Sequence, residues 1–556
     1  MKHLLQHFNE LSLHPKNAKA LKGLILQLAI QGKLTENWRA EHPDVESSKT
    51  LIGKIEKSRI ELISKGKIKD YGTYEYIDKG LQKYTIPESW LWCKLSNLTD
   101  LPYGKGLSKK ELVDEGFKVF GANGVIGKYS SYLYEESMLL ISCRGAYSGK
   151  PNISPEKCYV TSNSLVCEFY LNDEILRDFF FHVIDAVPKE HIVSGSAQPQ
   201  VTATNARELI VPLPPLQEQK AIVDIVEELF AEVEQLEKKT VQRIQLKQDY
   251  VTSALQNLAQ ANDVVKAWQT LQPQFKTFFD EKANIKSLRE SILQLAVQGK
   301  LTAHWRKQRR LSGAEAEPAS ELLKRIQSEK QKLIEAKKIR KGKAYDSIKE
   351  IELSFELPET WVWCRLVDLT ILITDGKHGN CKDEINSGYY FLSAKDVKKG
   401  RLSYENARQI NYEEFNEVHQ RTNLEAGDLC IVNTGATVGK SAIVEDNDYT
   451  RKTTFQKSVA VVKVIHEYID INYLDNFIKN QTPQLLKKSG GSAINNLLLD
   501  DMRKIITPLP PLEEQKAIVQ IVDELMAYCD TLERELEQRD VLIEDLMASC
   551  LHGVFN

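Results

Sequence analysis

Two stretches of the chain carry apolar residues at alternating spacings of four and three, which places them along one face of an α-helix. Their apolar positions are Ile222, Val226, Leu229, Val233 and Leu236, and then Ile518, Val522, Leu525, Cys529, Leu532, Leu536, Ile543, Leu546 and Cys550. Pro215 and Pro511 precede the two stretches and suit a first helical turn, where Glu218 and Glu514 face the positive end of the helix dipole. A helix of about 40 residues is about 60 Å long. One seam on each helix predicts that the two helices pack together, and packing on an ordinary core is the alternative.

These stretches belong to a tandem repeat. Three segments recur in the same order: 212–229 returns as 508–525 with 15 of 18 positions identical, 21–39 returns as 288–306 with 13 of 19, and the motif IPESWLWCKL at 86–95 returns as LPETWVWCRL at 357–366. The offsets are 296, 267 and 271 residues. A duplicated frame of roughly 270 to 300 residues explains this order.

The segments between the tryptophan motif and the proline motif differ between the copies. The second segment is 25 residues longer, and the two do not align convincingly. Both alternate β-forming residues with Gly, Asn and Ser, as in SMLLISCRGAYSG and GDLCIVNTGATVGKSAIV. We therefore expect two mixed α/β domains with many short strands, which present different surfaces from one repeated frame.

A basic stretch precedes each tryptophan motif. Residues 49–69 hold seven basic and two acidic residues, and residues 324–349 hold ten basic and three acidic residues. Both read as helical. A solvated helix face is one interpretation, and contact with a phosphate backbone or an acidic partner is the other.

Composition limits the classes of protein that remain. The chain has 556 residues, 42% hydrophobic and 27% charged, with a formal net charge of −3, which is ordinary for a globular protein of several domains. Its apolar runs are far shorter than the roughly 18 residues of a membrane span, and its start has no clean apolar leader, so a cytoplasmic location is expected. The nine cysteines show no C-x-x-C spacing, which indicates reduced, mostly buried thiols and neither a zinc site nor a disulfide framework.

Motifs for covalent chemistry are weak. GATVGKS at 435–441 has three residues between its glycines, whereas a phosphate loop needs four, so a turn between two strands explains it better. The proline run at 212–215 fits a strand-to-helix connection better than a polyproline ligand. We find neither a glycine-rich cofactor loop nor the loop with which DNA methyltransferases hold a flipped base. The sequence predicts no catalytic residue and no metal site.

Glycine-rich loops with Arg, Lys, Asn, Gln and Tyr remain, and such side chains can bind phosphates or base edges in a DNA groove. For any one of them, a solvent-facing turn residue is the competing interpretation. The candidates are Lys105, Lys109, Asn123, Lys128, Tyr129, Arg144, Ser148, Lys150, Gln198 and Gln200 in the first insert, and Lys377, His378, Lys395, Asn433, Thr434, Lys440, Arg451 and Lys452 in the second.

The repeated frame resembles the specificity subunit of type I restriction–modification systems. ILQLAVQGKL, ELPETWVWCRL and the twice-used PLPPLEEQKAIV carry this resemblance, together with the strand–turn segments SCRGAYSGK and GDLCIVNTGATVGKSAIV. It implies an α+β fold with two mixed α/β target-recognition domains, separated by two long antiparallel coiled-coil helices and related by an internal pseudo-twofold repeat. The expected segments are 1–89 (helical region), 90–211 (recognition domain), 212–260 (spacer helix), 261–360 (helical region), 361–507 (recognition domain) and 508–556 (spacer helix).

The same resemblance implies a non-catalytic protein that reads a split, asymmetric target in double-stranded DNA. Two modification subunits that bind S-adenosylmethionine, and restriction subunits that use ATP and Mg²⁺, would be its partners, with no cofactor in this chain. Candidate positions for partner docking are Leu216, Gln219, Lys220, Leu512, Gln515 and Lys516. Two heads on a rigid spacer meet one face of B-DNA when their half-sites lie about one turn apart, roughly 10 base pairs.

Two other hypotheses compete with this one. A coiled-coil scaffold without a nucleic-acid role explains the helices but not two divergent glycine-rich inserts. An enzyme acting alone would transfer methyl groups without partners.

Overall fold

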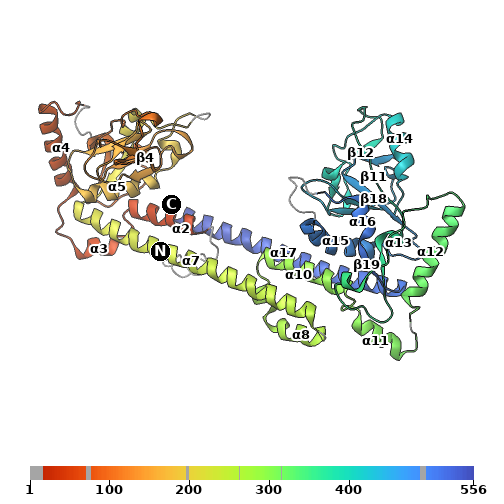
Figure 1. The fold of residues 1–556 in the computed structure, drawn as a ribbon. Coiled ribbons are helices and arrows are strands. Elements are labelled where there is room, and N and C mark those ends of the chain that lie inside the picture. The colour runs from red at the N-terminus through yellow and green to blue at the C-terminus, as the bar shows by residue number, and fades with distance from the viewer. Residues whose placement is uncertain are drawn as a thin grey trace. The chain divides into compact units, whose positions relative to one another are not determined.

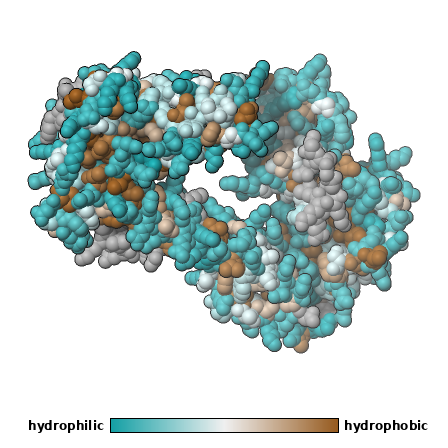
Figure 2. Space-filling model, turned by 60° about the vertical axis from the view of Figure 1, so that its left-hand side comes forward, coloured by the Kyte–Doolittle hydropathy of each residue, from teal (hydrophilic) through white to brown (hydrophobic). Residues whose placement is uncertain are grey.

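The computed structural model describes residues 17–70, 77–195, 199–261, 263–314, 316–488 and 496–555. It forms two compact units, one of residues 1–245 with 540–556 and one of residues 246–539. Within the described residues, no helix has the length and apolar character that crossing a membrane requires. Figure 2 shows a mostly hydrophilic surface on which apolar residues gather in separate patches.

The first unit begins with three helices and continues into a lobe, which we call lobe 1 (91–213). The helices are α2 (Asn17–Ile30), α3 (Glu36–Glu41) and α4 (Ser48–Ser64). Lobe 1 contains β1 (Leu91–Lys94), β2 (Thr99–Asp100), β3 (Phe117–Phe120), β4 (Val125–Tyr129), β5 (Leu139–Ser142), β6 (Pro151–Ile153), β7 (Tyr159–Val160), β8 (Ser164–Phe169), α5 (Glu174–Ala186), α6 (Ala203–Arg207) and β9 (Ile210–Leu213). The long helix α7 (Leu216–Gln260) follows it directly (Figure 1).

The second unit repeats this order, and its lobe is lobe 2 (362–509). Its helices before the lobe are α8 (Val264–Leu271), α9 (Phe275–Phe278), α10 (Lys282–Val297), α11 (Ala303–Leu311) and α12 (Ala319–Glu335). Lobe 2 contains β10 (Val362–Arg365), α13 (Leu366–Leu369), β11 (Thr370–Asp375), β12 (Tyr390–Leu392), β13 (Val397–Lys398), β14 (Arg401–Leu402), α14 (Tyr412–Thr422), β15 (Leu429–Val432), β16 (Ser441–Ile443), β17 (Thr453–Phe455), β18 (Val459–Val464), α15 (Ile471–Lys488), α16 (Leu499–Lys504) and β19 (Ile506–Leu509). The helix α17 (Leu512–Phe555) follows.

Both lobes are built on the same sheet, although their sequences do not align. The strand order is β2-β8-β5-β6 in lobe 1 and β11-β18-β15-β16 in lobe 2. A parallel pair accompanies each sheet, β3 with β7 and β12 with β17. An antiparallel pair closes each lobe, β1 with β9 and β10 with β19, with Trp92 opposite Pro212 and Trp363 opposite Pro508. The prediction of mixed α/β lobes on a repeated frame is confirmed.

The additional residues of the second insert build elements that lobe 1 lacks. In lobe 1, β3 pairs with β4 as a simple hairpin. In lobe 2, the corresponding β12 is followed by the small hairpin β13–β14 and by the helix α14. The lobes therefore share a core and differ at its margin.

A buried glutamate joins the three repeated motifs in each unit. Oε1 of Glu218 accepts hydrogen bonds from Oγ1 of Thr35 at 2.7 Å and from the guanidinium of Arg39 at 2.5 Å, and Oε2 accepts one from Nε1 of Trp90 at 2.8 Å. The Glu218 side chain is only 1% exposed. The sequence assigned Glu218 to the helix dipole alone, and the structure shows that it also holds the lobe and the preceding helices to the start of α7.

The second unit repeats this arrangement at Glu514. Its carboxylate accepts hydrogen bonds from Oγ1 of Thr302 at 2.7 Å, from Nε1 of Trp361 at 2.9 Å, and from the guanidinium of Arg306. The Glu514 side chain is 1% exposed. The repeated motifs are thus conserved between the copies because they share one network.

A glycine lets the same motifs approach each other closely. Gly299 has φ +69°, and a Cβ there would lie 2.8 Å from Cγ of Pro358 and 3.0 Å from Cζ2 of Trp361. Gly32 has φ +71°, and its Cβ would lie 2.7 Å from Cγ of Pro87. A larger residue would therefore meet both backbone strain and a clash.

The helical seams have more partners than the sequence predicted. In the first unit, Ile222, Val226 and Val233 share an apolar core with Leu21 and Ile25 of α2. In the second, α17 packs in a cluster with α10, where Arg289 contacts Asp530 at 2.6 Å and Glu533 at 3.1 Å. Expecting the other long helix as the single partner was therefore incomplete, because each seam also covers the helix that opens its own copy.

The final turns of α7 run antiparallel to α17 within the second unit. Lys247 contacts Asp280 at 2.6 Å, and Arg539 donates a hydrogen bond to the carbonyl of Asp280 at 3.2 Å. Leu258, three turns further along α7, lines the same apolar cavity as Leu525. Residues later in α7 therefore lie beside residues earlier in α17, as in an antiparallel pair.

Replacing Glu514 by alanine should strongly destabilise the second unit, because the Arg306 guanidinium and the Trp361 indole would lose their buried acceptor. We expect a loss of about 3 kcal/mol in the free energy of unfolding, measured by urea denaturation with circular dichroism. The neighbouring Glu513 is 60% exposed and pairs with Arg309, so Glu513→Gln is the matched control with a loss below about 1 kcal/mol. Equal losses in both variants would contradict a structural role specific to Glu514.

Candidate functional site

The turn between β5 and β6 carries the largest group of candidate side chains in lobe 1. Backbone hydrogen bonds from Ser142 to the carbonyl of Lys150 and from Gly149 to that of Ser142, both 2.9 Å, close this turn. Arg144 is exposed, and its backbone pairs with Gln200. Ser148 is buried and donates a hydrogen bond to the carbonyl of Pro199 at 2.7 Å, so it supports the loop instead of facing solvent.

The turn between β15 and β16 is its counterpart in lobe 2. Val432 donates to the carbonyl of Lys440, and Gly439 donates to that of Val432, both at 2.8 Å. Thr434 pairs with Asn496 through the backbone and donates its hydroxyl to Oδ1 of Asn496 at 3.0 Å. The prediction that GATVGKS forms a turn between two strands is confirmed.

These two turns place different side chains at equivalent positions. Arg144 with Gln200 in lobe 1 corresponds to Thr434 with Asn496 in lobe 2, because each pair bridges the first residue of the turn to the segment before α6 or α16. Lys150 and Lys440 end the two turns, and both are exposed. Two turns that share a backbone conformation but carry different polar side chains can distinguish ligands of different sequence on one scaffold.

The β3–β4 hairpin adjoins the turn of lobe 1. The carbonyl of Ala122 accepts the hydroxyl of Ser142, which joins the hairpin tip to the turn. Val125 and Ile126 are 50% and 54% exposed at this tip, beside the half-buried Asn123. Further along β4, Lys128 is exposed and the Tyr129 ring packs edge-on against Tyr159. The structure thus brings Asn123, Lys128, Arg144, Lys150 and Gln200 into one lobe-1 surface that also includes exposed aliphatic groups.

A second shared feature is a glycine–lysine pair at the end of the first sheet strand. Gly104-Lys105 and Gly376-Lys377 run parallel to Thr161 and Gln456 respectively. Lys105 is exposed, whereas Lys377 contacts Glu414 at 2.5 Å and Glu417 at 2.9 Å. These hydrogen bonds, first that of Glu414, raise the pKa of Lys377 above its usual value.

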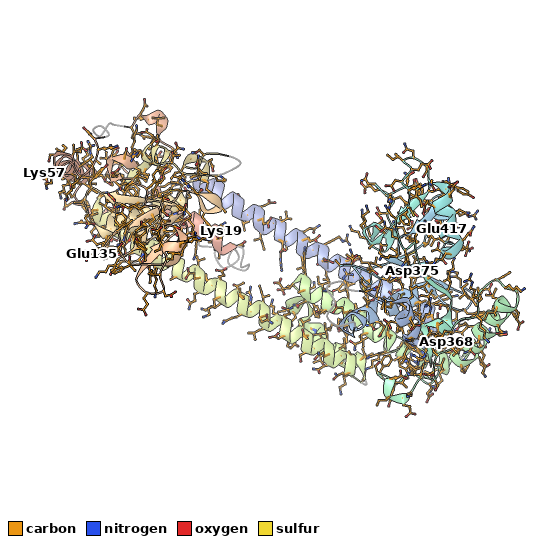
Figure 3. The ribbon with its side chains drawn as sticks, turned by 45° about the horizontal axis from the view of Figure 1, so that its top comes forward. Lys19, Lys57, Glu135, Asp368, Asp375 and Glu417 are labelled. Carbon is orange, nitrogen blue, oxygen red and sulfur yellow. The ribbon has the colours of Figure 1, made fainter. Side chains whose placement is uncertain are left out.

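Asp375 of lobe 2 contacts two further basic side chains near Lys377. Nε2 of His378 lies 2.9 Å from Oδ2 of Asp375, and Arg421 pairs with the other oxygen of Asp375. Figure 3 labels Asp375 and Glu417, both on lobe 2. Lys377 and His378 are therefore held by acids, and they are less available to an external anion than Lys105 is.

Among the other candidates, Asn433 joins the lobe-2 turn through its carbonyl, which accepts a hydrogen bond from the amide of Leu497 at 2.7 Å, and the remaining ones join neither cluster through a described contact. Lys109 is exposed in a short 3-10 turn, Lys395 is exposed before β13, and Arg451 and Lys452 are exposed before β17. Asn433 is buried, and its Oδ1 has no hydrogen-bond partner among the described residues. Gln198 lies outside the described residues.

The docking candidates at the start of the long helices divide into buried and exposed groups. Gln219 and Gln515 are fully buried and donate to the carbonyls of Pro214 and Pro510 at 2.8 and 3.0 Å. The half-buried Leu216 and Leu512 pack on the cores of their own units. Only Lys220 and Lys516 of this set are exposed.

The described cysteine side chains are buried and free, which confirms the prediction of reduced, buried thiols for those eight residues. Burial raises the pKa of the Cys143 thiol to about 12. No group of three or more His, Cys, Asp or Glu residues in the described part of the chain is arranged to hold a metal ion.

Sequence reasoning missed several residues of these surfaces. Asn496 was not among the sequence candidates, and its match to Gln200 becomes visible only through the paired backbones. Val125 and Ile126 looked like ordinary strand residues. Their position next to the Asn-Gly turn was the available signal, since side chains at a hairpin tip have few neighbours to cover them.

Two lobes of one fold, each presenting the same turn with different polar side chains, define a two-headed recognition protein. The chain belongs to the family of type I restriction modification DNA specificity domains, whose model matches residues 52–246 and 358–539. It is therefore a specificity subunit of a type I restriction–modification system, and its function is the recognition of DNA sequence.

Individual relatives match over most of their length. The chain is 25% identical to the Type I restriction enzyme EcoEI specificity subunit of Escherichia coli, covering 93% of this chain and 91% of that protein. It is also 25% identical to the EcoAI specificity subunit of Escherichia coli, covering 92% and 90%. The crystal structure of the HsdS subunit from Thermoanaerobacter tengcongensis is 14% identical, covers 85% of this chain and 98% of that one, and has a TM-score of 0.38.

Replacing Gly104 by alanine should destabilise lobe 1, because the new Cβ would lie 2.4 Å from the backbone carbonyl oxygens of both Val160 and Thr161. Backbone atoms cannot move aside as a flexible side chain can, so we expect a loss of about 1 to 3 kcal/mol in thermal unfolding experiments. Gly106→Ala is the matched control, since that Cβ would meet nothing within 4 Å, and its effect should stay within about 0.5 kcal/mol. The close approach would be refuted by a Gly104→Ala protein as stable as the control.

Proposed function

We propose that each lobe reads one half of a split, asymmetric DNA target through its turn and the neighbouring loops. One observation carries this proposal. Arg144 pairs with Gln200 in lobe 1, and Thr434 pairs with Asn496 at the equivalent backbone positions of lobe 2. Different side chains at equivalent positions favour different half-sites in the DNA target.

The chemistry of these groups suits base edges. An arginine can donate two hydrogen bonds to O6 and N7 of guanine, and Asn or Gln can pair with N6 and N7 of adenine. Threonine accepts or donates one hydrogen bond and offers a methyl group to thymine. The exposed Val125 and Ile126 beside Asn123 add apolar contact, which suits a thymine methyl group in the same way. Exposed lysines such as Lys105 and Lys150 supply phosphate contacts, which give affinity without choice.

We further propose that the chain is not itself catalytic and positions partner subunits. The partners would be two modification subunits that bring S-adenosylmethionine and restriction subunits that bring ATP and Mg²⁺. The exposed Lys220 and Lys516, at the starts of the two long helices, are candidate contacts because the repeat places them at equivalent positions. Methyl transfer by the purified chain alone would contradict this division of roles.

Exchanging residues 370–505 for the corresponding insert of a relative with another target should change one half-site and leave the other intact. The exchange begins at β11 and ends before β19, so it keeps the closing strand pair and the Glu514 network. Methylome sequencing of cells that carry the hybrid with its partner subunits gives the result. Loss or change of both half-sites together would refute independent reading by the lobes.

Replacing Arg144 by alanine should weaken binding to the cognate duplex by about 1 to 3 kcal/mol and relax the preference at one base pair of a single half-site. Titration of a panel of single-substitution duplexes in the presence of the partner subunits measures both effects. Lys109→Ala removes another exposed cation of lobe 1 and should weaken all duplexes about equally. If Arg144→Ala behaved in the same uniform way, Arg144 would contact phosphate and not a base.

The coiled-coil scaffold without a nucleic-acid role, considered from the sequence, is disfavoured by the family match, and a binding experiment tests the same point. Because a scaffold needs no sequence preference, it predicts equal binding of target and scrambled duplexes at every salt concentration. The proposed function predicts a preference for the target that persists as salt rises.

A further inference from the structure

The basic stretches before the lobes are a fourth part of the duplicated frame. α4 and α12 are both 17 residues long, and their bounds differ by 271 residues, the offset of the tryptophan motif. Both bury the same face, with Leu51 and Ile55 corresponding to Leu322 and Ile326. At the next position of this face, Arg59 bonds to Glu56, and the Lys330 ammonium group donates to the carbonyls of Val367 at 2.6 Å and of Asp368 at 3.4 Å. Figure 3 labels Asp368 at this junction of α12 with lobe 2.

The two copies diverge where these helices end. Gly66, two residues after the end of α4, has φ +66°, whereas the equivalent residue after α12 is Lys337, with φ +55°. The amide of Lys337 donates to the carbonyl of Ile334, and that of Lys338 donates to Leu333, both at 2.9 Å. A left-handed conformation favours glycine at such a helix end. A lysine that occupies it despite the cost indicates a demand other than stability at this point.

Residues 337–343, which we call the strap, concentrate unpaired positive charge. The strap has the sequence KKIRKGK, and its five cations are exposed. None of the five forms an ion pair with a carboxylate in the described residues, whereas Lys324, Arg325 and Lys332 of α12 each pair with a glutamate.

The strap is fixed at both ends. It begins at the end of α12, and just beyond it Tyr345 donates a hydrogen bond to Oδ1 of Asp500 at 2.8 Å. The guanidinium of Arg365 donates to the carbonyl of Asp346 at 3.2 and 3.0 Å. The strap therefore runs between two anchors. Lys343 lies over the ring of Tyr345 at 5.7 Å, and none of the five cations forms an ion pair with a described carboxylate.

A cavity of about 890 Å³ with mixed polar and apolar walls lies between the strap and lobe 2. Lys338, Ile339 and Arg340 line it from the strap, and Glu417, Arg421, Glu425 and Lys463 are the charged residues that line it from the lobe. The charged residues of the lobe pair with one another or with neighbouring lobe residues, whereas Lys338 and Arg340 form no ion pair among the described residues.

We propose that the strap binds the sugar–phosphate backbone of duplex DNA, which it holds beside lobe 2. This inference rests on the proposed function and adds a contact that is independent of sequence. Phosphate contacts need exposed cations and no apolar anchor, and Ile339 is the single large apolar residue of the strap. A protein partner of acidic surface would instead be expected to meet a buried apolar centre within the contact.

The test compares a charge-removing variant, K338Q/R340Q/K341Q/K343Q, with a charge-retaining variant, K338R/R340K/K341R/K343R. Both keep Lys337 and the Tyr345 anchor. The dissociation constant of target and scrambled duplexes is measured between 50 and 200 mM KCl, with the full chain in complex with its partner subunits. Each phosphate contact contributes about 0.9 to the slope of log affinity against log salt concentration. For each contact that a variant has lost, its affinity should therefore drop about threefold less than that of the wild type between the lowest and the highest salt concentration.

We expect the charge-removing variant to lose at least two such contacts on both duplexes, with an unchanged ratio of target to scrambled affinity. The charge-retaining variant should keep the wild-type slope. An unchanged slope in the charge-removing variant would overturn the proposal. It would also be overturned if the slope changed by the same amount in the charge-retaining variant as in the charge-removing variant. Weakened assembly with the partner subunits at an unchanged DNA slope would assign the strap to a protein and likewise overturn it. Failure of the proposed function looks different, since the wild-type protein would then show no preference for the target.

Discussion

The buried carboxylate at the start of each long helix is the interaction on which the rest of the structure depends. Glu218 and Glu514 each accept hydrogen bonds from a threonine, an arginine and a tryptophan that belong to two other repeated motifs. An ionised carboxylate with so little exposure is stable only when its partners are in place. The network therefore fixes where the lobe begins, where the helix begins, and how the preceding helices approach them.

This dependence explains why the two copies of the frame are much more alike in sequence than the two lobes are. A change of one network residue leaves a buried charge or donor without its partner, so the motifs can change only together. The outward-facing residues of the β5–β6 and β15–β16 turns, such as Arg144 and Thr434, are under no such constraint. Arg144 and Thr434 occupy the same backbone position, and replacing one with the other disturbs no buried contact of the described structure. Recognition can thus diverge while the fold stays constant.

Much of the frame could be predicted from the sequence because its signals are local and repeated. The heptad seams, the strand-to-helix entries at the proline motifs and the turn nature of GATVGKS all follow from short patterns, and the structure confirms them. The glutamate network could not be found in this way, because Trp90 and Glu218 are 128 residues apart and neither is unusual in its own segment. The common sheet of the two lobes was hidden as well, since a sheet tolerates many apolar sequences and the inserts differ in length.

The candidate site was harder to predict than the fold for a related reason. Charge and residue type do not reveal which groups are already satisfied. Lys105 and Lys377 occupy equivalent positions after equivalent glycines, yet Lys377 is held by two glutamates of α14, a helix that lobe 1 lacks. Ser148 and Gln219 looked like surface groups and proved to be buried hydrogen-bond donors. What separates a recognition residue from a supporting one is the presence of an internal partner, and that property depends on contacts between segments far apart in the chain.

The pairing state of the cations also bears on how the two copies divide their work. Both copies supply the helix, a basic residue at the same position of its inner face and a left-handed residue just after the helix, and the second continues with five cations that form no ion pair among the described residues. A duplicated frame gives two equal sites at first, and a difference of charge at one of them makes the halves unequal toward any polyanion. Such cations bind phosphates whatever the base sequence is. They can therefore raise the affinity of one half for DNA without altering which bases that half selects. Asymmetry of affinity and asymmetry of sequence choice are therefore separable in this chain, because they reside in different segments of the second unit, the strap and lobe 2.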